Sequence, residues 1–189
     1  MKNIALFASG SGSNAENIIK YFEKHPNIRV DSVWSNKKAA FVLQRALNLG
    51  VESHYFTRTE FIETDFLLKK LQKRKIELIV LAGFLWLVPP EFVEAFTIIN
   101  IHPALLPLYG GKGMYGSFVH EAVLQNKEKE SGITIHLVNK DYDKGDHLVQ
   151  VRCPVLPDDS VDTLSTRIHE LEYKYLPKAI EEYLCPKTK

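Results

Sequence analysis

Short runs of β-branched and aromatic residues alternate along this chain with stretches whose apolar residues recur at helical spacing. Parallel strands need long crossover connections, usually helices, so this alternation is typical of a largely parallel sheet covered by helices. It predicts an α/β fold. The strand candidates are residues 4–8, 30–34, 54–56, 76–82, 98–101, 133–138 and 147–152.

Three of the connecting segments carry helix signals. Apolar residues from Ala15 to Phe22 fall at i, i+3, i+4 and i+7, the spacing of one helix face. A second helix is predicted near residues 61–74, and a third begins about Pro89–Pro90, because the fixed φ of proline suits a first helical turn. The longest irregular stretch, residues 103–116, is rich in glycine and proline, and we interpret it as a functional loop.

Length and composition favour one globular domain. The 189 residues are 45% hydrophobic and 25% charged, which excludes the disordered, collagenous and disulfide-scaffold classes. A chain of this length buries a core without crosslinks. The two cysteines, Cys153 and Cys185, stand in no metal-binding spacing and are expected to be reduced. We therefore predict a single domain over residues 1–189 that binds no metal.

Charge and apolar runs exclude further classes of partner. Lys and Arg number 24 against 23 Asp and Glu, a formal charge of +1, so no overall field draws the protein to nucleic acid or anionic lipid. The N-terminal apolar run is too short for a signal peptide or a membrane span. We predict a cytoplasmic protein that binds neither nucleic acid nor membranes.

The first chemical signal is the sequence ASGSGSN at residues 8–14, where a strand is expected to turn into a helix. Glycines allow close backbone approach, and the free N–H groups of a helix start can bind a phosphate. The glycine spacing also fits a dinucleotide fingerprint, but the second strand ends in Ser35-Asn36 without the carboxylate that would bind a ribose diol. A single phosphate is therefore favoured over NAD. The alternative is a plain turn capped by Asn14.

The second signal is Asn100-Ile101-His102-Pro103 at the end of an apolar strand. Residues two apart in a strand point to the same face, so Asn100 and His102 can converge on one substrate oxygen. An amide N–H and an imidazolium are suitable donors for a developing oxyanion. The alternative for a strand-end histidine is an ordinary hydrogen-bonded polar residue.

An acidic loop follows at residues 139–146, between two predicted strands. A carboxylate from this loop near His102 would raise the pKa of the imidazole and make it a general acid. Taken alone, the loop is equally a solvated hairpin turn, and it lacks the terminal Glu of an EF-hand.

These motifs resemble those of the phosphoribosylglycinamide formyltransferase family, the folate-dependent formyltransferases of purine synthesis. The resemblance runs nearly end to end. It is carried by residues 4–14, 35–37, 81–84, 100–107, 132–138 and 143–145.

The resemblance implies a seven-stranded, mostly parallel sheet with helices on its faces, a Rossmann-like formyltransferase fold. Residues 1–100 would form a mononucleotide-binding half and residues 101–189 a folate-binding half. It also implies transfer of the formyl group of 10-formyltetrahydrofolate, the co-substrate, to the amine of N1-(5-phospho-D-ribosyl)glycinamide, with no metal required. The partners would be these small molecules, and the protein would be a monomer or a weak homodimer.

Site residues follow from the same resemblance. The ribonucleotide phosphate would meet Gly12, Ser13, Asn14 and Ala15, while His169 and Glu172 of the last helix would approach its ribose and amine. The folate donor would lie against Leu85, Trp86, Leu87, Val88, Asn100 and Asp141. Asn100 and His102 would stabilise the oxyanion formed by direct attack of the amine, and Asp143 would hold His102 protonated and oriented.

Four features leave alternatives open. Trp86 stands where many relatives have a basic residue, so it is either a stacking surface for the pterin or a packing residue. Residues 59–66 offer no arginine to the ligands, although Arg58 is close. Residues 109–116 are either a lid or an ordinary surface loop. His169 lies off the apolar stripe of its helix and is also consistent with a plain solvent-facing residue.

Rival functions remain. A formyltetrahydrofolate deformylase shares the Asn-x-His block but commonly has an additional N-terminal domain, and this chain starts at its first strand. A methionyl-tRNA formyltransferase would need a nucleic-acid-binding domain and a basic surface. A non-catalytic sensor would bind the ribonucleotide without turnover, which the presence of Asn100, His102 and Asp143 disfavours.

Overall fold

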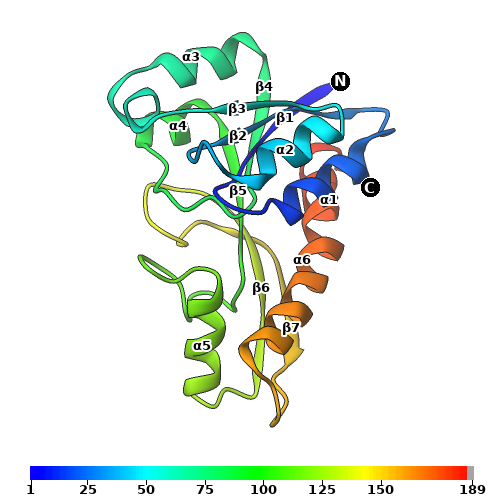
Figure 1. The fold of residues 1–189 in the computed structure, drawn as a ribbon, viewed down its shortest axis with the longest axis vertical. Coiled ribbons are helices and arrows are strands. Elements are labelled where there is room, and N and C mark those ends of the chain that lie inside the picture. Colours follow the sequence, from blue (N-terminus) through cyan, green and yellow to red (C-terminus); the bar gives the residue numbers. More distant parts are fainter. Residues whose placement is uncertain (187–189) are drawn as a thin grey trace.

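The computed structural model describes residues 1–186, and these form one seven-stranded sheet in the order β3-β2-β1-β4-β5-β6-β7 (Figure 1). Strands β1 to β5 are parallel, whereas β6 and β7 each run antiparallel to the strand before them. Each of the seven predicted strands is confirmed. The strands are β1 (Lys2–Phe7), β2 (Ile28–Ser35), β3 (Glu52–Tyr55), β4 (Ile76–Leu81), β5 (Thr97–His102), β6 (Glu130–Leu137) and β7 (His147–Pro154).

Helices cover both faces of the sheet, as a mostly parallel sheet requires. One face packs against α1, α2 and α6, and the other against the π-helical turn η1 with α3 and α4. In Figure 1 the long α6 begins along β6 and β7 and ends beside α1. The helices are α1 (Ser13–Phe22), α2 (Phe41–Asn48), η1 (Thr59–Glu63), α3 (Phe66–Lys73), α4 (Pro90–Ala95), α5 (Ser117–Gln125) and α6 (Val161–Leu184).

The central strand β1 shows how the sequence produces this layering. Ile4 and Leu6 point into the core on the α1 side, while Ala5 and Phe7 point into the aromatic core on the α3 side. All four side chains are at most 1% exposed. A strand buried on both faces needs a continuous apolar run rather than an alternating one, and residues 4–8 provide it.

The helix predictions are confirmed in part. The start of α1 and the first turn of α4 at Pro90 agree with the sequence signals. The helix predicted near residues 61–74 is confirmed over α3, but the extended Thr64 separates α3 from the preceding turn η1, so the predicted span comprises two elements. Helices α2 and α5 carry no signal that we identified, and neither begins with a side-chain cap.

Strand order places a ligand crevice between β1 and β4. The chain runs from β1 outward to β2 and β3, then returns to β4 on the opposite side, and open α/β sheets bind ligands outside the carboxyl ends of strands at such a switch point. Ser9 braces this point. Its N–H donates to the Gly83 carbonyl at 2.9 Å, and its hydroxyl donates to Asn36 at 2.7 Å and accepts from the Leu85 N–H at 3.0 Å.

Within residues 1–186, no helix has the length and apolar character to cross a bilayer. Cys153 and Cys185 are free thiols, the first buried and the second partly exposed.

Candidate active site

A cavity of about 750 Å³ opens at the carboxyl ends of β1, β4 and β5. It gathers segments far apart in the chain: the glycine loop before α1, the segment after β4, the end of β5, the loop after β6 and one face of α6. All but one of the predicted site residues line it. The exception is Ala15, whose side chain is fully buried in the core, so only its backbone remains available for the predicted phosphate contact.

The glycine loop presents backbone rather than side chains. Gly12 has φ of +76° and precedes α1, and no side chain within residues 1–186 caps that helix. The free N–H groups of Ser13 and its neighbours therefore give a helix N-terminus suited to an anion. The alternative in which Asn14 caps the turn is wrong, because the Asn14 amide donates instead to a carboxylate oxygen of Glu172 at 2.8 Å.

Gly12 also fixes the packing of α2. A Cβ at this position would overlap the side chain of Val42 and approach its Cα to 2.9 Å. The Val42 N–H donates to the Gly10 carbonyl at 3.2 Å, so α2 is bonded directly to the loop. From the sequence, glycine at position 12 is expected only because a ligand approaches the backbone closely. The structure gives two further reasons for glycine here: the close contact with α2 and the left-handed φ.

Glu172 is the most buried carboxylate of the cavity, at 5% exposure. Burial raises the pKa of Glu172, against the opposing effects of the Asn14 hydrogen bond and of His169. His169 Nε2 lies 4.0 Å from the carboxylate, and its own side chain is 48% exposed. Glu172 therefore faces inward, joins α6 to α1 through Asn14 and borders the cavity.

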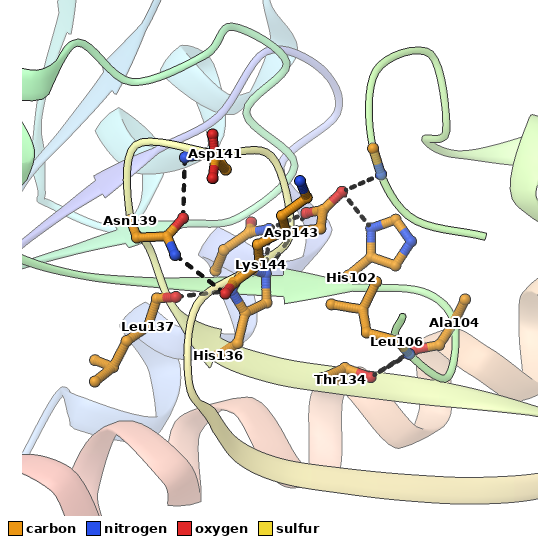
Figure 2. Close-up of polar contacts among 12 residues, drawn as sticks. His102, Ala104, Leu106, Thr134, His136, Leu137, Asn139, Asp141, Asp143 and Lys144 are labelled. Atoms are coloured by element: carbon orange, nitrogen blue, oxygen red, sulfur yellow. Dashed lines mark hydrogen bonds and ion pairs between the residues drawn. The ribbon is translucent and has the colours of Figure 1, made fainter. Parts of the chain in front are cut away.

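Asn100, His102 and Asp143 converge at the end of β5, and Figure 2 shows His102 beside Asp143. The Asn100 amide lies 3.4 Å from Asp143 Oδ1, and His102 Nδ1 lies 3.6 Å from Asp143 Oδ2. The His102 side chain is 4% exposed and that of Asp143 is 11% exposed. The predicted shared face of Asn100 and His102 is thus observed, and the acidic loop does bring its carboxylate to them.

The expected raised pKa of His102 is wrong, because its pKa is lowered. Burial lowers the pKa of His102 more than Asp143 and the Tyr109 carbonyl raise it, and His136 lowers it further. For Asp143, burial alone would raise the pKa, but the nearby His136, whose Nε2 lies 3.5 Å from Oδ1, the charge of His102 and the Gly111 N–H together lower it. The site therefore holds a carboxylate beside an imidazole that is neutral at pH 7.

Sequence reasoning missed His136 of β6. It pairs with Asn100 across the antiparallel β5–β6 ladder, and the two side chains lie 3.1 Å apart. His136 Nδ1 donates to the Leu137 carbonyl at 2.9 Å, so its Nε2 is left to accept from Asn100. The amide of Asn100 is thereby shared between His136 and Asp143. A substrate oxygen would displace the longer bond, to Asp143, more easily.

His120 of α5 was also missed. The residue is 2% exposed and borders the cavity, and its Nδ1 has no hydrogen-bond partner within residues 1–186. Burial, with the charges of His169 and His102, lowers the pKa of His120 to about 4. Its helix carries no capping signal, so only the fold places this histidine beside the site.

The loop after β6 is tightly folded. Asn139 accepts a hydrogen bond from the Asp141 N–H and donates one to the Lys144 carbonyl, both at 3.0 Å (Figure 2). Gly145 lies so close to β6 that a Cβ would overlap the carbonyl of Leu137. These contacts set the position from which Asp143, at φ of +52°, reaches the end of β5.

The segment after β4 forms an apolar wall. Leu85 and Leu87 are 38% and 41% exposed, whereas Val88 is 4% exposed. Trp86 is half-buried and contacts Phe56, Phe61 and Phe84, so it has both a packing role and a face toward the cavity. The Arg58 guanidinium lies 5.9 Å from the centre of the Trp86 ring, so a cation lies close to this aromatic side chain.

The part of the chain that the structure describes contains no group of three or more His, Cys, Asp or Glu arranged to hold a metal ion. Residues 111–116 of the irregular loop border the cavity.

Comparison with known proteins places this site in context. A family model described as formyl transferase matches residues 2–180. Phosphoribosylglycinamide formyltransferase of Haemophilus influenzae is 34% identical, over 96% of this chain and 86% of the relative. The crystal structure of phosphoribosylglycinamide formyltransferase from Streptococcus pneumoniae matches with a TM-score of 0.84 and 38% identity, over 97% of this chain and 99% of that one.

Chloroplastic phosphoribosylglycinamide formyltransferase of Vigna unguiculata is 36% identical over 97% of this chain. The chain spans only 61% of that relative and 62% of its Arabidopsis thaliana counterpart. The match to the bacterial relative covers most of both chains, and the family model covers nearly all of this one. The chain therefore belongs to the formyl transferase family, among the phosphoribosylglycinamide formyltransferases.

Proposed function

We propose that this protein transfers the formyl group of 10-formyltetrahydrofolate to the amine of N1-(5-phospho-D-ribosyl)glycinamide, giving the N-formyl product and tetrahydrofolate for purine synthesis. One observation carries the proposal: a free helix N-terminus, an apolar wall and the Asn100–His102–Asp143 cluster all border a single cavity. An anionic acceptor and a flat donor can therefore lie side by side, and proximity of two bound reactants contributes much of a bimolecular rate.

The acceptor would lie between α1 and α6. Ser13 and Asn14 offer backbone N–H groups to its phosphate. Glu172 and His169 border the same end of the cavity, where a carboxylate and an imidazole can hydrogen-bond a ribose hydroxyl or an amine. The phosphate and the reacting amine would thus be held by different elements.

The donor would lie against the segment after β4. Leu85 and Leu87 are exposed apolar side chains beside the aromatic Trp86, which suits the flat ring of a pterin. Asp141 is exposed at the mouth of the cavity and can accept from the ring's N–H groups. The residues present fit the group, and the formyl carbon is the electrophile that this co-substrate supplies.

Asn100 and His102 would act on the oxygen that gains negative charge as the amine adds. Asn100 contributes an amide N–H after giving up its 3.4 Å bond to Asp143. His102 is neutral at first, and Nδ1 would take up the proton that the adding amine releases, because the developing negative charge adds to that of Asp143. Asp143 would hold that imidazolium in place, and no protein nucleophile is needed.

A donor-consumption assay tests the proposal. Purified protein is mixed with 10-formyltetrahydrofolate, with and without the ribonucleotide, and tetrahydrofolate is measured. Turnover that depends on the ribonucleotide is expected, and His102→Ala provides the matched inactive control. Turnover without the ribonucleotide would indicate a deformylase, and ribonucleotide binding without turnover would indicate a sensor.

Location and assembly stay predictions. The proposed compartment is the cytoplasm, although the plant relatives carry the word chloroplastic in their names. The proposed state is a monomer or a weak homodimer, with small molecules rather than nucleic acid or membranes as partners.

A further inference from the structure

Residues 109–111, the Tyr109 strap, contact both members of the acid–imidazole pair. The Tyr109 carbonyl lies 2.7 Å from His102 Nε2, and the Gly111 N–H donates to Asp143 Oδ2 at 2.9 Å. The same carboxylate oxygen lies 3.6 Å from His102 Nδ1. Two consecutive peptide groups of the strap therefore set the spacing between Asp143 and His102.

The carbonyl also decides which nitrogen of His102 exchanges its proton. A carbonyl can only accept a hydrogen bond, so Nε2 must carry a hydrogen in this geometry. Neutral His102 then has its lone pair on Nδ1, the nitrogen that faces Asp143. The proton gained or lost during a reaction is the one on Nδ1, and the Tyr109 carbonyl keeps it there.

The position of this carbonyl depends on a contact outside the cavity. The Tyr109 hydroxyl donates to Glu128 Oε1 at 2.7 Å, across a partly buried contact with the turn between α5 and β6. Tyr109 has φ of +57°, a left-handed conformation that a residue with a large side chain adopts only where other contacts hold it. Neither Tyr109 nor Glu128 is among the described residues that border the cavity.

We propose that the Glu128–Tyr109 hydrogen bond is a positioning anchor: it holds the Tyr109 carbonyl on His102 Nε2 and thereby orients the imidazole for the formyl transfer. The proposal rests on the function proposed above. Glu128 acts through Tyr109 and His102 and touches neither substrate, so it is a positioning residue.

Several neighbouring groups affect the pKa of His102. Asp143 and the Tyr109 carbonyl favour its protonated form, while burial and His136 disfavour it. The charge of His102 contributes to the lowered pKa of His120, which is neutral at pH 7. Loosening the strap would remove one of the two stabilising contacts, so the pKa of His102 should fall further.

Four variants test the anchor. Glu128→Ala and Tyr109→Phe each remove the hydrogen bond, whereas Glu128→Gln keeps an acceptor oxygen. We expect the first two to lower kcat by about 3-fold to 10-fold, the size of effect of one lost hydrogen bond, with KM for both substrates nearly unchanged. Glu128→Gln should retain near-normal kcat. Glu121→Ala, on the preceding helix, is the matched control and should leave kcat unchanged.

The decisive readout is the NMR titration of the His102 ring, which needs no substrate. In Glu128→Ala and in Tyr109→Phe the midpoint of the His102 titration should move to lower pH. In a variant that combines both substitutions it should move no further. This readout separates the anchor from the proposed function, whose failure would appear as absent turnover in the wild type. An unchanged titration in both single variants, even with lowered thermal stability, would overturn the proposal. So would an equal loss of kcat in Glu128→Gln and Glu128→Ala.

Discussion

The two ends of the cavity are built in opposite ways. At the α1 end the groups presented to a ligand are backbone N–H groups, and the decisive residue is Gly12, which has no side chain. At the β5 end they are largely buried side chains: Asn100 donates to Asp143, and the Asp143 carboxylate lies 3.6 Å from His102. One end depends on close packing of main chain, and the other on the electrostatics of buried groups.

Substitutions at the two ends should therefore fail differently. A backbone site is lost when its neighbours are displaced, so stability and acceptor binding should change together. A buried side-chain site can lose its chemistry while the fold remains, because the substituted group is small and the surrounding sheet is intact.

The largest effect is expected at the end of β5. His102→Ala or Asn100→Ala should lower kcat by about 100-fold to 1,000-fold, the usual loss for one oxyanion donor, with much smaller changes in ligand affinity. Steady-state kinetics and binding titrations of both ligands check this. Near-normal turnover in either variant would remove that residue from the mechanism.

Asp143→Asn should lower kcat by roughly 100-fold, because an amide cannot favour an imidazolium as a carboxylate does. Asp143 raises the pKa of His102, so its loss should move the titration of that ring to lower pH. Circular dichroism should show an unchanged fold. The same His102 midpoint in both proteins would contradict the assigned role.

At the other end, Gly12→Ala should reduce stability by about 3 kcal/mol, since the added Cβ overlaps Val42 and the φ is left-handed. KM for the ribonucleotide should rise in the same variant, while folate affinity should change little at a temperature where the protein remains folded. Thermal melts and kinetics check both. The matched control is Gly10→Ala, whose Cβ would meet nothing within 4 Å. If Gly12→Ala melts like the control, the close contact with α2 is not what requires glycine.

A smaller effect concerns His120, which stands between the two ends. The pKa of His120 is about 4 in the folded protein, below the ordinary 6.5, so the unfolded chain binds the proton more tightly. Protonation of His120 should therefore lower the free energy of unfolding as the pH drops from 6.5 toward 4. The expected loss between pH 7 and pH 5 is about 2 kcal/mol.

Urea melts of wild type and His120→Leu at several pH values measure this contribution. The leucine variant should lack it, and subtracting the two curves removes the contribution of His102, which is present in both proteins. Parallel curves across this range would show that His120 is not held neutral by the fold.

The smallest effect is expected on the apolar wall. Folate analogues should quench tryptophan fluorescence, because Trp86 borders the cavity while the other tryptophan, Trp34, is 1% exposed and lies in the core behind it. Trp86→Phe should remove most of the quenching and retain much of the affinity, since an aromatic face survives. Trp34→Phe should leave the quenching in place. The reverse pattern would place the donor elsewhere.

The sequence predicts the local features of the site but not its long-range contacts. Strand runs and the Asn100–His102 spacing are local features, so β5 and its shared face follow from the residues themselves. The approach of Asp143, about 40 positions away, could be expected only from the resemblance, because it depends on how the loop after β6 folds back.

His136 and His120 were missed for related reasons. The role of His136 follows from the antiparallel register that sets it beside Asn100, and that register is a property of strand pairing. His120 belongs to a helix without a capping side chain, which follows a glycine-rich loop. The lowered pKa of His102 escaped prediction because burial at a sheet end is a tertiary property that opposes the attraction of the nearby carboxylate.

The close approach of Gly145 to β6 also limits how this site can diverge under selection. Lys140 and Lys144 are exposed, so the loop tolerates changes of charge and size at those positions. Any side chain at position 145 would push the loop away from Leu137 and carry Asp143 with it. New substrate preferences can therefore arise along the rim of this loop at little cost to the chemistry. At the base of the loop, position 145 must remain glycine.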